Sequence, residues 1–279
     1  MTAGDKIKKT IIYILLIILA ATCMFPFLLM MVNATRDGVE ITRSFTLIPS
    51  THIKENWETV FSFFNLFKGM WNSLKVAVPA TLLTAYFSAM TAYGLAMYKF
   101  RGNKLIFTAI LVFMMIPGQL SLIGFYNLCT KLKLVNSYIP LIIPAIAAPG
   151  TVFFLRQYIL SVMSPSLVEA ARIDGASSWK ILWRVVCPMT KSSFITFGLM
   201  NFITCYNSYM WPSLITDADE KMMVSQGLRK FFIEGGAYGT EWPLVMAGST
   251  LIVLPLLILF AFTQKWFING IGGDTGMKG

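Results

Sequence analysis

The polar segment 164–188 reads SPSLVEAARIDGASSWKILWRVVCP and carries the most distinctive pattern of functional side chains in this sequence. Two carboxylates stand there among small side chains, and the residues concerned are Glu169, Ala170, Ala171, Asp174, Gly175 and Ala176. Small side chains let the surface of another protein approach the backbone closely. The pattern therefore suits a plug that docks into a partner better than it suits an active site.

Two short helices are expected to position these residues. Ser164 can cap the first helix, and Gly175 is a natural stop for it. Ser177 or Ser178 can cap the second helix, which Pro188 should end. The apolar faces should carry Leu167, Ala170 and Ala171 in the first helix, and Trp179, Leu182, Trp183 and Val186 in the second. The alternative is an ordinary amphipathic surface hairpin between two membrane spans.

The composition of the chain indicates a membrane protein. Of its 279 residues, 56% are hydrophobic and only 13% are charged, whereas soluble domains usually carry about 25% charged residues. The net charge is +10, but the basic residues stand at the ends of apolar runs. Anionic lipid and the positive-inside bias explain them there, so the charge does not predict nucleic-acid binding.

Six runs of the sequence contain no charged residue and are long enough to cross a bilayer. They are 10–35, 76–98, 105–130, 134–155, 192–216 and 242–264. Each exceeds the roughly 20 residues that a helix needs to cross the hydrocarbon. The predicted fold is therefore an all-α integral membrane protein with six transmembrane helices.

The basic residues also predict the orientation. Three lysines immediately precede the first run, and the loop 99–104 after the second run carries three more basic residues. Cytoplasmic loops carry such an excess of lysine and arginine. We therefore expect both termini, and the segment 164–188, to be cytoplasmic.

Three of the runs contain residues that a plain transmembrane helix avoids. Pro117 and Gly118 should break the third span, and Pro140, Pro144 and Pro149 should bend the fourth. Non-helical backbone within a membrane is tolerated where protein or water surrounds it. The fifth span carries a polar stripe, formed by Asn201, Thr204 and Ser208 with Tyr206 and Asn207 nearby. This stripe either faces a solute pathway or bonds helices together.

Two outer segments also carry patterns. In the segment 36–75, apolar residues repeat at helical spacing and predict an interfacial helix, and they are Ile53, Trp57, Phe61 and Phe64. Packing on the spans and contact with an outside partner are equally open for this face. The segment 217–241 is expected to be a polar outer loop.

The residues that are absent exclude several functions. The only histidine, His52, lies outside the runs, so no histidine-based metal or catalytic site can form in the bilayer. The four cysteines lack paired spacing, and the sequence has no G-x-x-x-x-G-K-[ST] loop for ATP. A secondary transporter usually needs ionisable groups within the membrane, and these runs hold none. We therefore expect neither an enzyme active site nor a metal site in these runs.

The spaced motif of Glu169-Ala170-Ala171, Asp174-Gly175-Ala176 and Pro188 resembles the EAA loop of ABC importer permeases. Over nearly its whole length the chain looks like the smaller permease subunit of maltose-type carbohydrate importers. Further marks of this likeness are Ile116–Gln119, Arg156-Gln157, Trp211-Pro212, Gly227-Leu228, Gln264 with Phe267, and Lys278-Gly279. The departures are Gly124, Cys187, Lys191 and Gly273-Asp274, none of which touches Glu169 or Gly175.

This resemblance implies the fold and the domain limits. The fold would be that of a type I importer permease, with a single transmembrane domain over 1–279 and a core region over 71–264. The segment 164–188 would be the cytoplasmic coupling loop, and 265–279 would be a cytoplasmic tail.

The resemblance also implies partners. They would be a second homologous permease, two ATPase subunits that bind ATP and Mg, an extracytoplasmic sugar-binding protein, and the lipid of a bacterial cytoplasmic membrane. The alternative is a permease for another delivered solute such as glycerol phosphate, or a secondary transporter.

Finally, the resemblance assigns roles to residues. The ATPase would contact the six residues from Glu169 to Ala176 named above, and also the tail residues Met277, Lys278 and Gly279. Apart from the resemblance, the candidate pathway residues, if the polar stripe faces a solute and does not bond helices, are Gln119, Asn201, Thr204, Tyr206, Asn207 and Ser208. The binding protein would contact Gly227, Gly235 and Gly236.

Overall fold

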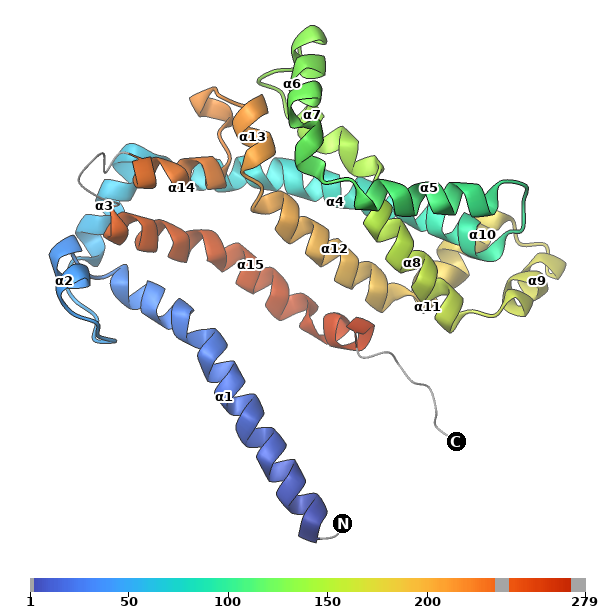
Figure 1. Cartoon of the computed structure of the whole chain (residues 1–279), viewed down its shortest axis with the longest axis horizontal. Helices are drawn as coiled ribbons and strands as arrows, with labels where there is room; N and C mark the ends of the chain where they lie inside the picture. Colours follow the sequence, from blue (N-terminus) through green and yellow to red (C-terminus); the bar gives the residue numbers. More distant parts are fainter. Residues whose placement is uncertain (1–2, 234–240, 272–279) are drawn as a thin grey trace. The chain divides into compact units, whose positions relative to one another are not determined.

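The computed structural model describes residues 3–233 and 241–271, and every regular element in these ranges is helical (Figure 1). The chain divides into two compact units. One comprises Met1–Phe67 with Gly227–Pro255, and the other comprises Lys68–Gln226 with Leu256–Gly279. The predicted coupling segment and the predicted polar stripe both belong to the second unit.

The first unit is built from long and short helices. They are α1 (Ala3–Asn33), α2 (Gly38–Arg43), α3 (Ile53–Phe63), most of α14 (Val224–Ile233) and the first half of α15 (Trp242–Ile271). The second unit contains the remaining elements. They are α4 (Leu66–Met97), α5 (Asn103–Met115), η1 (Gly118–Ser121), α6 (Leu122–Lys131), α7 (Ile139–Ile142), η2 (Ile143–Ile146), α8 (Pro149–Val162), α9 (Pro165–Ile173), α10 (Ser178–Ile181), η3 (Leu182–Val186), α11 (Cys187–Met189), α12 (Lys191–Tyr206), α13 (Met210–Ile215) and η4 (Asp219–Lys221).

Four helical segments in the described part of the chain are long and apolar enough to cross a membrane. They are Gly4–Asn33, Leu66–Met97, Ile139–Val162 and Trp242–Trp266. A fifth span results if Asn103–Met115 and Gly118–Lys131 are taken together. The run 192–216 does not form one long helix, because α12 ends after 16 residues and α13 follows separately. The structure is compatible with six spans but does not confirm that number.

The predicted proline breaks are confirmed. The two halves of the third run meet at an angle of 86°, where Ile116 and Pro117 adopt extended backbone. Proline has no N–H for the helix and pushes the preceding residue out of the helical region. In the fourth run, α7, η2 and α8 each have a proline in their first turn. Short helical pieces therefore replace a straight span at both places.

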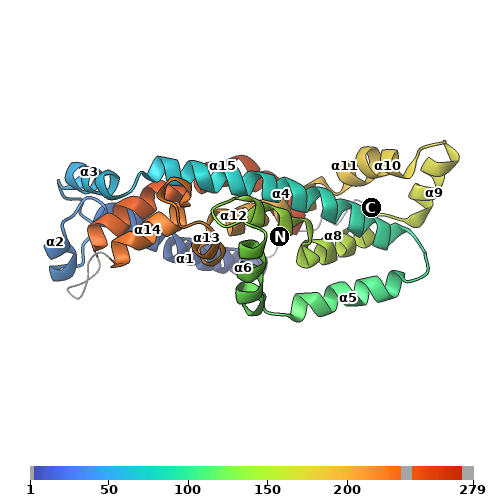
Figure 2. The same ribbon diagram turned by 90° about the horizontal axis from the view of Figure 1, so that it is seen from above.

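The core of the second unit joins α4, α8 and the predicted coupling segment. Its buried residues come from α4 (Ala89, Ala92, Tyr93, Leu95), from α8 (Val152, Leu155, Ile159), and from the region 163–186 (Met163, Val168, Ile181, Leu182, Val186). Figures 1 and 2 both show α9 beyond the carboxyl end of α4 and α10 beside the last part of α4, while α6 and α13 lie farther toward its start. This unit therefore carries two separate regions of interest.

In the first unit, the outer segments differ from the sequence-based expectation. The predicted loop 217–241 contains the helix α14, because Leu228 and Phe231 form an apolar face that packs on Gly248 of α15. The helix α3 is confirmed, but it buries Asn56 and Val60, whereas Ile53 is 48% exposed. The buried side of α3 therefore overlaps the predicted apolar face, since Phe64 is buried and Trp57 and Phe61 are half-buried.

Candidate functional site

The segment 164–188 forms the expected pair of short helices, α9 and α10. Pro165 stands in the first turn of α9, where its missing N–H costs nothing. Ser177 caps α10 because its hydroxyl accepts a hydrogen bond from the Lys180 N–H at 3.3 Å. Ser164 occupies the cap position of α9, but its hydroxyl lies 2.8 Å from that of Ser166 and makes no cap bond. The hairpin is thus confirmed, with Ser177 as the capping serine.

The turn between the two helices depends on Gly175. The N–H of Ala176 donates to the Ala171 carbonyl at 3.0 Å, and the N–H of Gly175 donates to the Arg172 carbonyl at 2.9 Å. These two bonds form a Schellman motif, which places Gly175 in the left-handed region with a φ of 78°. No heavy atom would lie within 4 Å of a Cβ at this position. The backbone conformation, rather than a lack of space, therefore favours glycine here.

The six predicted coupling residues divide into an outward and an inward group. Glu169, Ala170, Asp174 and Gly175 are exposed, whereas Ala171 and Ala176 pack against the core of the unit. The neighbouring Ile173 is 86% exposed, and the sequence analysis did not single it out. The only sequence signal for the exposure of Ile173 was its position between Arg172 and Asp174 at a helix end.

Aliphatic side chains anchor the hairpin to the rest of its unit. Val168 of α9 and Ile181 of α10 are 2% and 0% exposed, and both belong to the core cluster with α4 and α8. Full burial of such a side chain stabilises a fold by about 1.5–3 kcal/mol. The predicted face of α9 was partly wrong, because Leu167 is 38% exposed and Val168 is buried in its place. The tip is therefore held on a rigid base.

The second helix of the hairpin continues beyond the expected end. A π-helical turn, Leu182–Val186, precedes Pro188, and α11 extends to Met189. The N–H of Cys187 donates to the Leu182 carbonyl, five residues back. A proline ring clashes with the carbonyl four residues before it, and the wider π turn accommodates the ring. Pro188 therefore widens the helix instead of ending it.

The tryptophans of the hairpin lie on its surface, which corrects the predicted second face. Leu182 and Val186 are buried, but Trp179 is 51% exposed and Trp183 is 36% exposed. Their rings meet Tyr86 of α4, with centroids 6.1 Å and 5.6 Å away. An exposed aromatic group of this kind is typical of a membrane–water interface.

Arg172 ties α9 to the end of α4. Its guanidinium lies 4.5 Å from the centroid of the Tyr98 ring, and the Tyr98 hydroxyl is 2.9 Å from that of Tyr93. Burial acts to raise the pKa of Tyr98, but hydrogen bonds with Ser178, Tyr93 and Arg172 outweigh it and lower that pKa. The hydrogen bond with Tyr98 raises the pKa of Arg172. These contacts hold the hairpin in one orientation on its unit.

The polar stripe of α12 is divided between two roles. The Asn201 amide donates to the hydroxyls of Thr81 and Thr84 on α4, at 3.4 Å and 3.3 Å. This end of the stripe joins helices, as the second interpretation of the stripe expected. Thr204 and Ser208 instead line a cavity of about 360 Å³. A role in a solute pathway therefore stays open for Thr204 and Ser208.

The other predicted pathway residues lie apart from that cavity wall. Gln119 is exposed in η1, although its neighbour Ser121 lines the cavity. Tyr206 is fully buried and stacks on Phe202 with 5.9 Å between the ring centroids. Asn207 is exposed at the end of α12. The structure brings only Thr204 and Ser208 of the predicted set together at the cavity.

Gly227 has a structural explanation within the first unit. A Cβ at this position would lie 2.1 Å from the Phe64 ring, so the close approach of Phe64 requires glycine. Its predicted contact with a binding protein stays a prediction. Gly235, Gly236 and the tail residues Met277, Lys278 and Gly279 lie outside the described residues.

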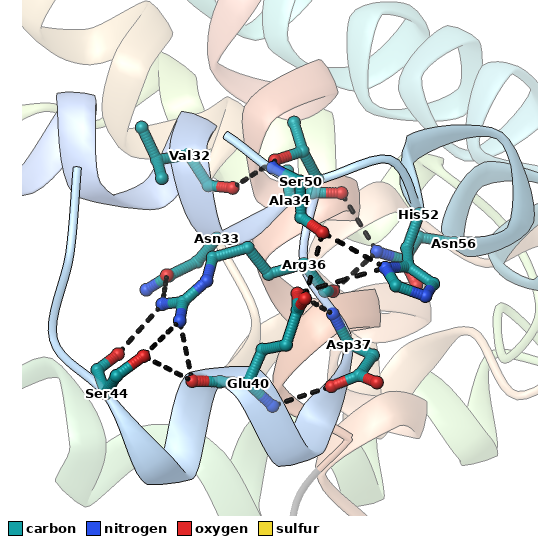
Figure 3. Close-up of polar contacts among 11 residues, drawn as sticks. Val32, Asn33, Ala34, Arg36, Asp37, Glu40, Ser44, Ser50, His52 and Asn56 are labelled. Atoms are coloured by element: carbon teal, nitrogen blue, oxygen red, sulfur yellow. Dashed lines mark hydrogen bonds and ion pairs between the residues drawn. The ribbon is translucent and has the colours of Figure 1, made fainter. Parts of the chain in front are cut away.

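A polar cluster at the end of α1 was not found by the sequence analysis (Figure 3). Arg36 is only 4% exposed, and its guanidinium donates to the Glu40 carbonyl at 2.7 Å and to the Ser44 carbonyl at 3.0 Å. The Asn56 amide donates to the carbonyls of Ala34 and Arg36, at 3.0 Å and 2.9 Å. These bonds join the ends of α1 and α2 to α3.

A short motif could have revealed part of this cluster. Asp37 and Glu40 form a capping box at the start of α2, in which each side chain accepts a hydrogen bond from the other residue's N–H. An acidic or hydroxyl residue followed three positions later by glutamate is its sequence signature. The Glu40 carboxylate also accepts from the Ser50 hydroxyl at 3.0 Å. The cluster is fully accounted for as structural support of the first unit.

Comparisons with known proteins agree with this architecture. The arabinooligosaccharides transport system permease protein AraQ of Bacillus subtilis is 30% identical over 277 residues, covering 97% of this chain and 96% of the relative. The protein of the same name from Halalkalibacterium halodurans is 32% identical over 264 residues, covering 92% of this chain and 93% of the relative.

The fold is also found among solved structures. A chain from the crystal structure of a bacterial ABC transporter involved in the import of the acidic polysaccharide alginate matches with a TM-score of 0.78 and 23% identity, covering 96% of this chain and 99% of that chain. The model for the family described as binding-protein-dependent transport system inner membrane component matches residues 85–272. The chain thus has the type I importer permease fold and belongs to the family of binding-protein-dependent transport system inner membrane components.

Proposed function

We propose that this chain is the permease subunit of an ATP-driven sugar importer and that the α9–α10 hairpin couples it to a cytoplasmic ATPase. The observation that carries the proposal is the hairpin itself, with an exposed tip of small and acidic residues on a buried aliphatic base. Family membership adds the expected context of a multi-subunit importer. The ATPase, not this chain, would bind ATP and Mg.

The tip offers a partner three kinds of contact. Ala170 and Gly175 allow close approach of a surface, and Glu169 offers a carboxylate to a basic group. Ile173 adds an exposed apolar side chain that a cleft would bury. A central apolar anchor beside polar contacts is typical of a specific protein interface.

Sugar as the solute is supported by the named functions of the relatives. Both AraQ proteins are arabinooligosaccharide permeases by name, and they align with almost the whole of this chain. The remaining partners would be a second homologous permease and an extracytoplasmic sugar-binding protein. The chain would be a multi-pass protein of a bacterial cytoplasmic membrane, with both termini and the hairpin in the cytoplasm.

Charge reversal at the tip tests the coupling role. We expect Glu169→Lys to reduce ATPase co-purification and ATP-dependent sugar uptake, because the carboxylate that should face a basic group becomes basic. Glu220→Lys is the matched control, since Glu220 is exposed in η4 of the same unit. Equal retention of co-purification and uptake by both variants contradicts the coupling role.

A second variant separates docking from folding. Ala170 is exposed, so Ala170→Trp should leave the stability of the isolated permease unchanged. Overpacking a protein core costs on the order of 1–3 kcal/mol, and we expect a tight cleft around the tip to respond in the same way, so that stimulated ATPase activity falls. Full ATPase activity with a tryptophan at this position excludes a tight cleft around the tip.

The proposed orientation has its own test. A single cysteine at Lys180 in α10 should react with a membrane-impermeant thiol reagent in inside-out vesicles and not in intact cells. Labelling from outside intact cells places the hairpin on the wrong side for a cytoplasmic ATPase.

A further inference from the structure

The cavity beside α12 has a size and a position that the coupling role does not explain. It measures about 360 Å³ and lies within the second unit. Its lining comes from α4, from the broken spans and from the α12–α13 junction, and comprises Val76, Ser121, Phe125, Pro140, Leu141, Pro144, Thr204, Cys205, Ser208, Trp211, Pro212 and Met223. Small-molecule sites commonly measure roughly 300–1,000 Å³. The cavity therefore has room for a small solute unit and not for a long chain.

An aromatic pair forms one wall of the cavity. The rings of Phe125 on α6 and Trp211 on α13 meet edge to face, with 5.0 Å between their centroids and 86° between their planes. The arrangement is a preferred one for aromatic pairs and holds both rings in place. An indole or phenyl face is a flat apolar surface, and the C–H face of a sugar ring can lie against it. Pro140 and Pro144 complete this wall with rigid apolar side chains.

Two of the three hydroxyl groups that line the cavity act as hydrogen-bond acceptors toward it. The Ser121 hydroxyl donates its proton to the Gly118 carbonyl at 2.7 Å, and the Thr204 hydroxyl donates to the Met200 carbonyl at 2.8 Å. Each hydroxyl then presents only lone pairs to the cavity, since it has a single proton to give. Acceptors of this kind match ligand hydroxyl groups, which donate. They repel the oxygen atoms of a phosphate or a carboxylate.

The uncharged lining also favours a neutral ligand with hydroxyl groups. None of the residues that line the cavity in the described part of the chain is charged. The Lys221 ammonium in η4 donates a hydrogen bond to the Asn136 carbonyl and does not belong to the lining. Moving an anion into such a site without a counter-charge costs several kcal/mol. The lack of a counter-charge in the lining and the lone pairs of the Ser121 and Thr204 hydroxyls therefore both disfavour an anion in the cavity.

We propose that this cavity is a transmembrane subsite for one uncharged sugar unit, held between the Trp211–Phe125 wall and the hydroxyls of Ser121, Thr204 and Ser208. The inference rests on the proposed function as a sugar permease and adds the charge class of the solute. It assigns the delivered solute to neutral sugars, and it excludes glycerol phosphate and uronate chains as solutes for this subsite.

Cys205 supplies a native reporter, because its thiol belongs to a residue of the cavity wall. In the assembled importer, Cys23, Cys129 and Cys187 are replaced by alanine, and the rate of Cys205 modification by methyl methanethiosulfonate is measured. The solutes added are maltose, lactose and arabinobiose as neutral sugars, and glycerol 3-phosphate and a mannuronate disaccharide as anions. A variant that keeps only Cys23, which is exposed on α1 of the first unit, is the matched control.

We expect at least one neutral sugar to slow the modification of Cys205 severalfold and to leave Cys23 unaffected, while neither anion protects Cys205. Ser208→Ala should raise the sugar concentration needed for protection. The inference is overturned if an anion protects Cys205 from modification. It is also overturned if vesicles that contain the importer take up a neutral sugar and this sugar leaves the rate of Cys205 modification unchanged.

Uptake in the same vesicles separates this outcome from failure of the proposed function. ATP-dependent uptake of a neutral sugar without protection of Cys205 leaves the importer role standing and removes the subsite. ATP-dependent uptake of the anions alone overturns the inference and the sugar assignment, while import itself stands. ATP-dependent uptake of none of the five solutes overturns the sugar assignment together with the subsite.

Discussion

The α9–α10 hairpin and the α12 cavity belong to the same unit, but their surfaces have opposite chemistry. The hairpin exposes Glu169, Ile173 and Asp174 beside small residues, whereas the cavity is lined by aromatic, proline and hydroxyl side chains without charge. The hairpin is rigid because aliphatic residues anchor it to α4 and α8. Prolines break the spans around the cavity, and Pro140 and Pro144 belong to its lining. One unit therefore combines an exposed, charged hairpin tip with an uncharged cavity of solute size.

The largest expected effect separates the base of the hairpin from its tip. Ile181 is 0% exposed and Ile173 is 86% exposed, so the same substitution has different consequences at the two positions. Ile181→Ala should destabilise the permease by about 2–5 kcal/mol through lost packing. Ile173→Ala should leave thermal unfolding unchanged but reduce ATPase co-purification. A stable Ile173→Ala variant with full co-purification shows that the exposed tip is not the docking surface.

The next effect concerns the turn of the hairpin. A left-handed residue with a Cβ costs roughly 1–2 kcal/mol, and Gly175 has a φ of 78°. Gly175→Val should therefore distort the tip and reduce uptake and stimulated ATPase activity. Gly150→Ala on α8 is the control, because a Cβ there also meets nothing within 4 Å but the helical backbone tolerates it. If both variants transport equally well, the left-handed turn is not needed for coupling.

A smaller effect distinguishes the two ends of the polar stripe. Asn201→Leu removes two hydrogen bonds to α4, and such bonds in membranes average about 0.6 kcal/mol. We expect a slightly lower melting temperature with an unchanged KM for uptake. Ser208→Ala should leave the melting temperature unchanged and raise the KM for uptake, because Ser208 lines the cavity. If Asn201→Leu raises the KM and Ser208→Ala does not, the solute contacts the α4 interface and not the cavity.

The smallest expected effect concerns the contact between α9 and α4. Arg172→Lys keeps the charge but loses the planar group that lies over the Tyr98 ring. We expect a small reduction in coupled uptake at unchanged permease stability. The hydrogen bond to Arg172 helps to lower the pKa of Tyr98, so the ionisation of Tyr98 should shift to higher pH in this variant. Spectroscopic titration, with a Tyr98→Phe variant as the reference, measures that shift. An unchanged pKa of Tyr98 contradicts the contact between Arg172 and Tyr98.

Local signals in the sequence were enough to predict several features of this protein. Proline removes a backbone donor and restricts its predecessor, so the breaks at Pro117 and Pro140 followed from residue type alone. Gly175 ended a helix for a similarly local reason, because only glycine adopts positive φ without strain. The hairpin and the apolar spans likewise need no knowledge of distant residues.

Tertiary structure decided which partner each face meets. Periodicity placed Leu167 on the inner face of α9, but the position of α4 and α8 made Val168 the buried residue. Asn201 became a link between helices because Thr81 and Thr84 stand opposite it on α4. Gly227 is required by Phe64, which lies far from it in the sequence. A pattern within one segment defines an apolar or polar face, but only the fold brings the distant residues that such a face will contact.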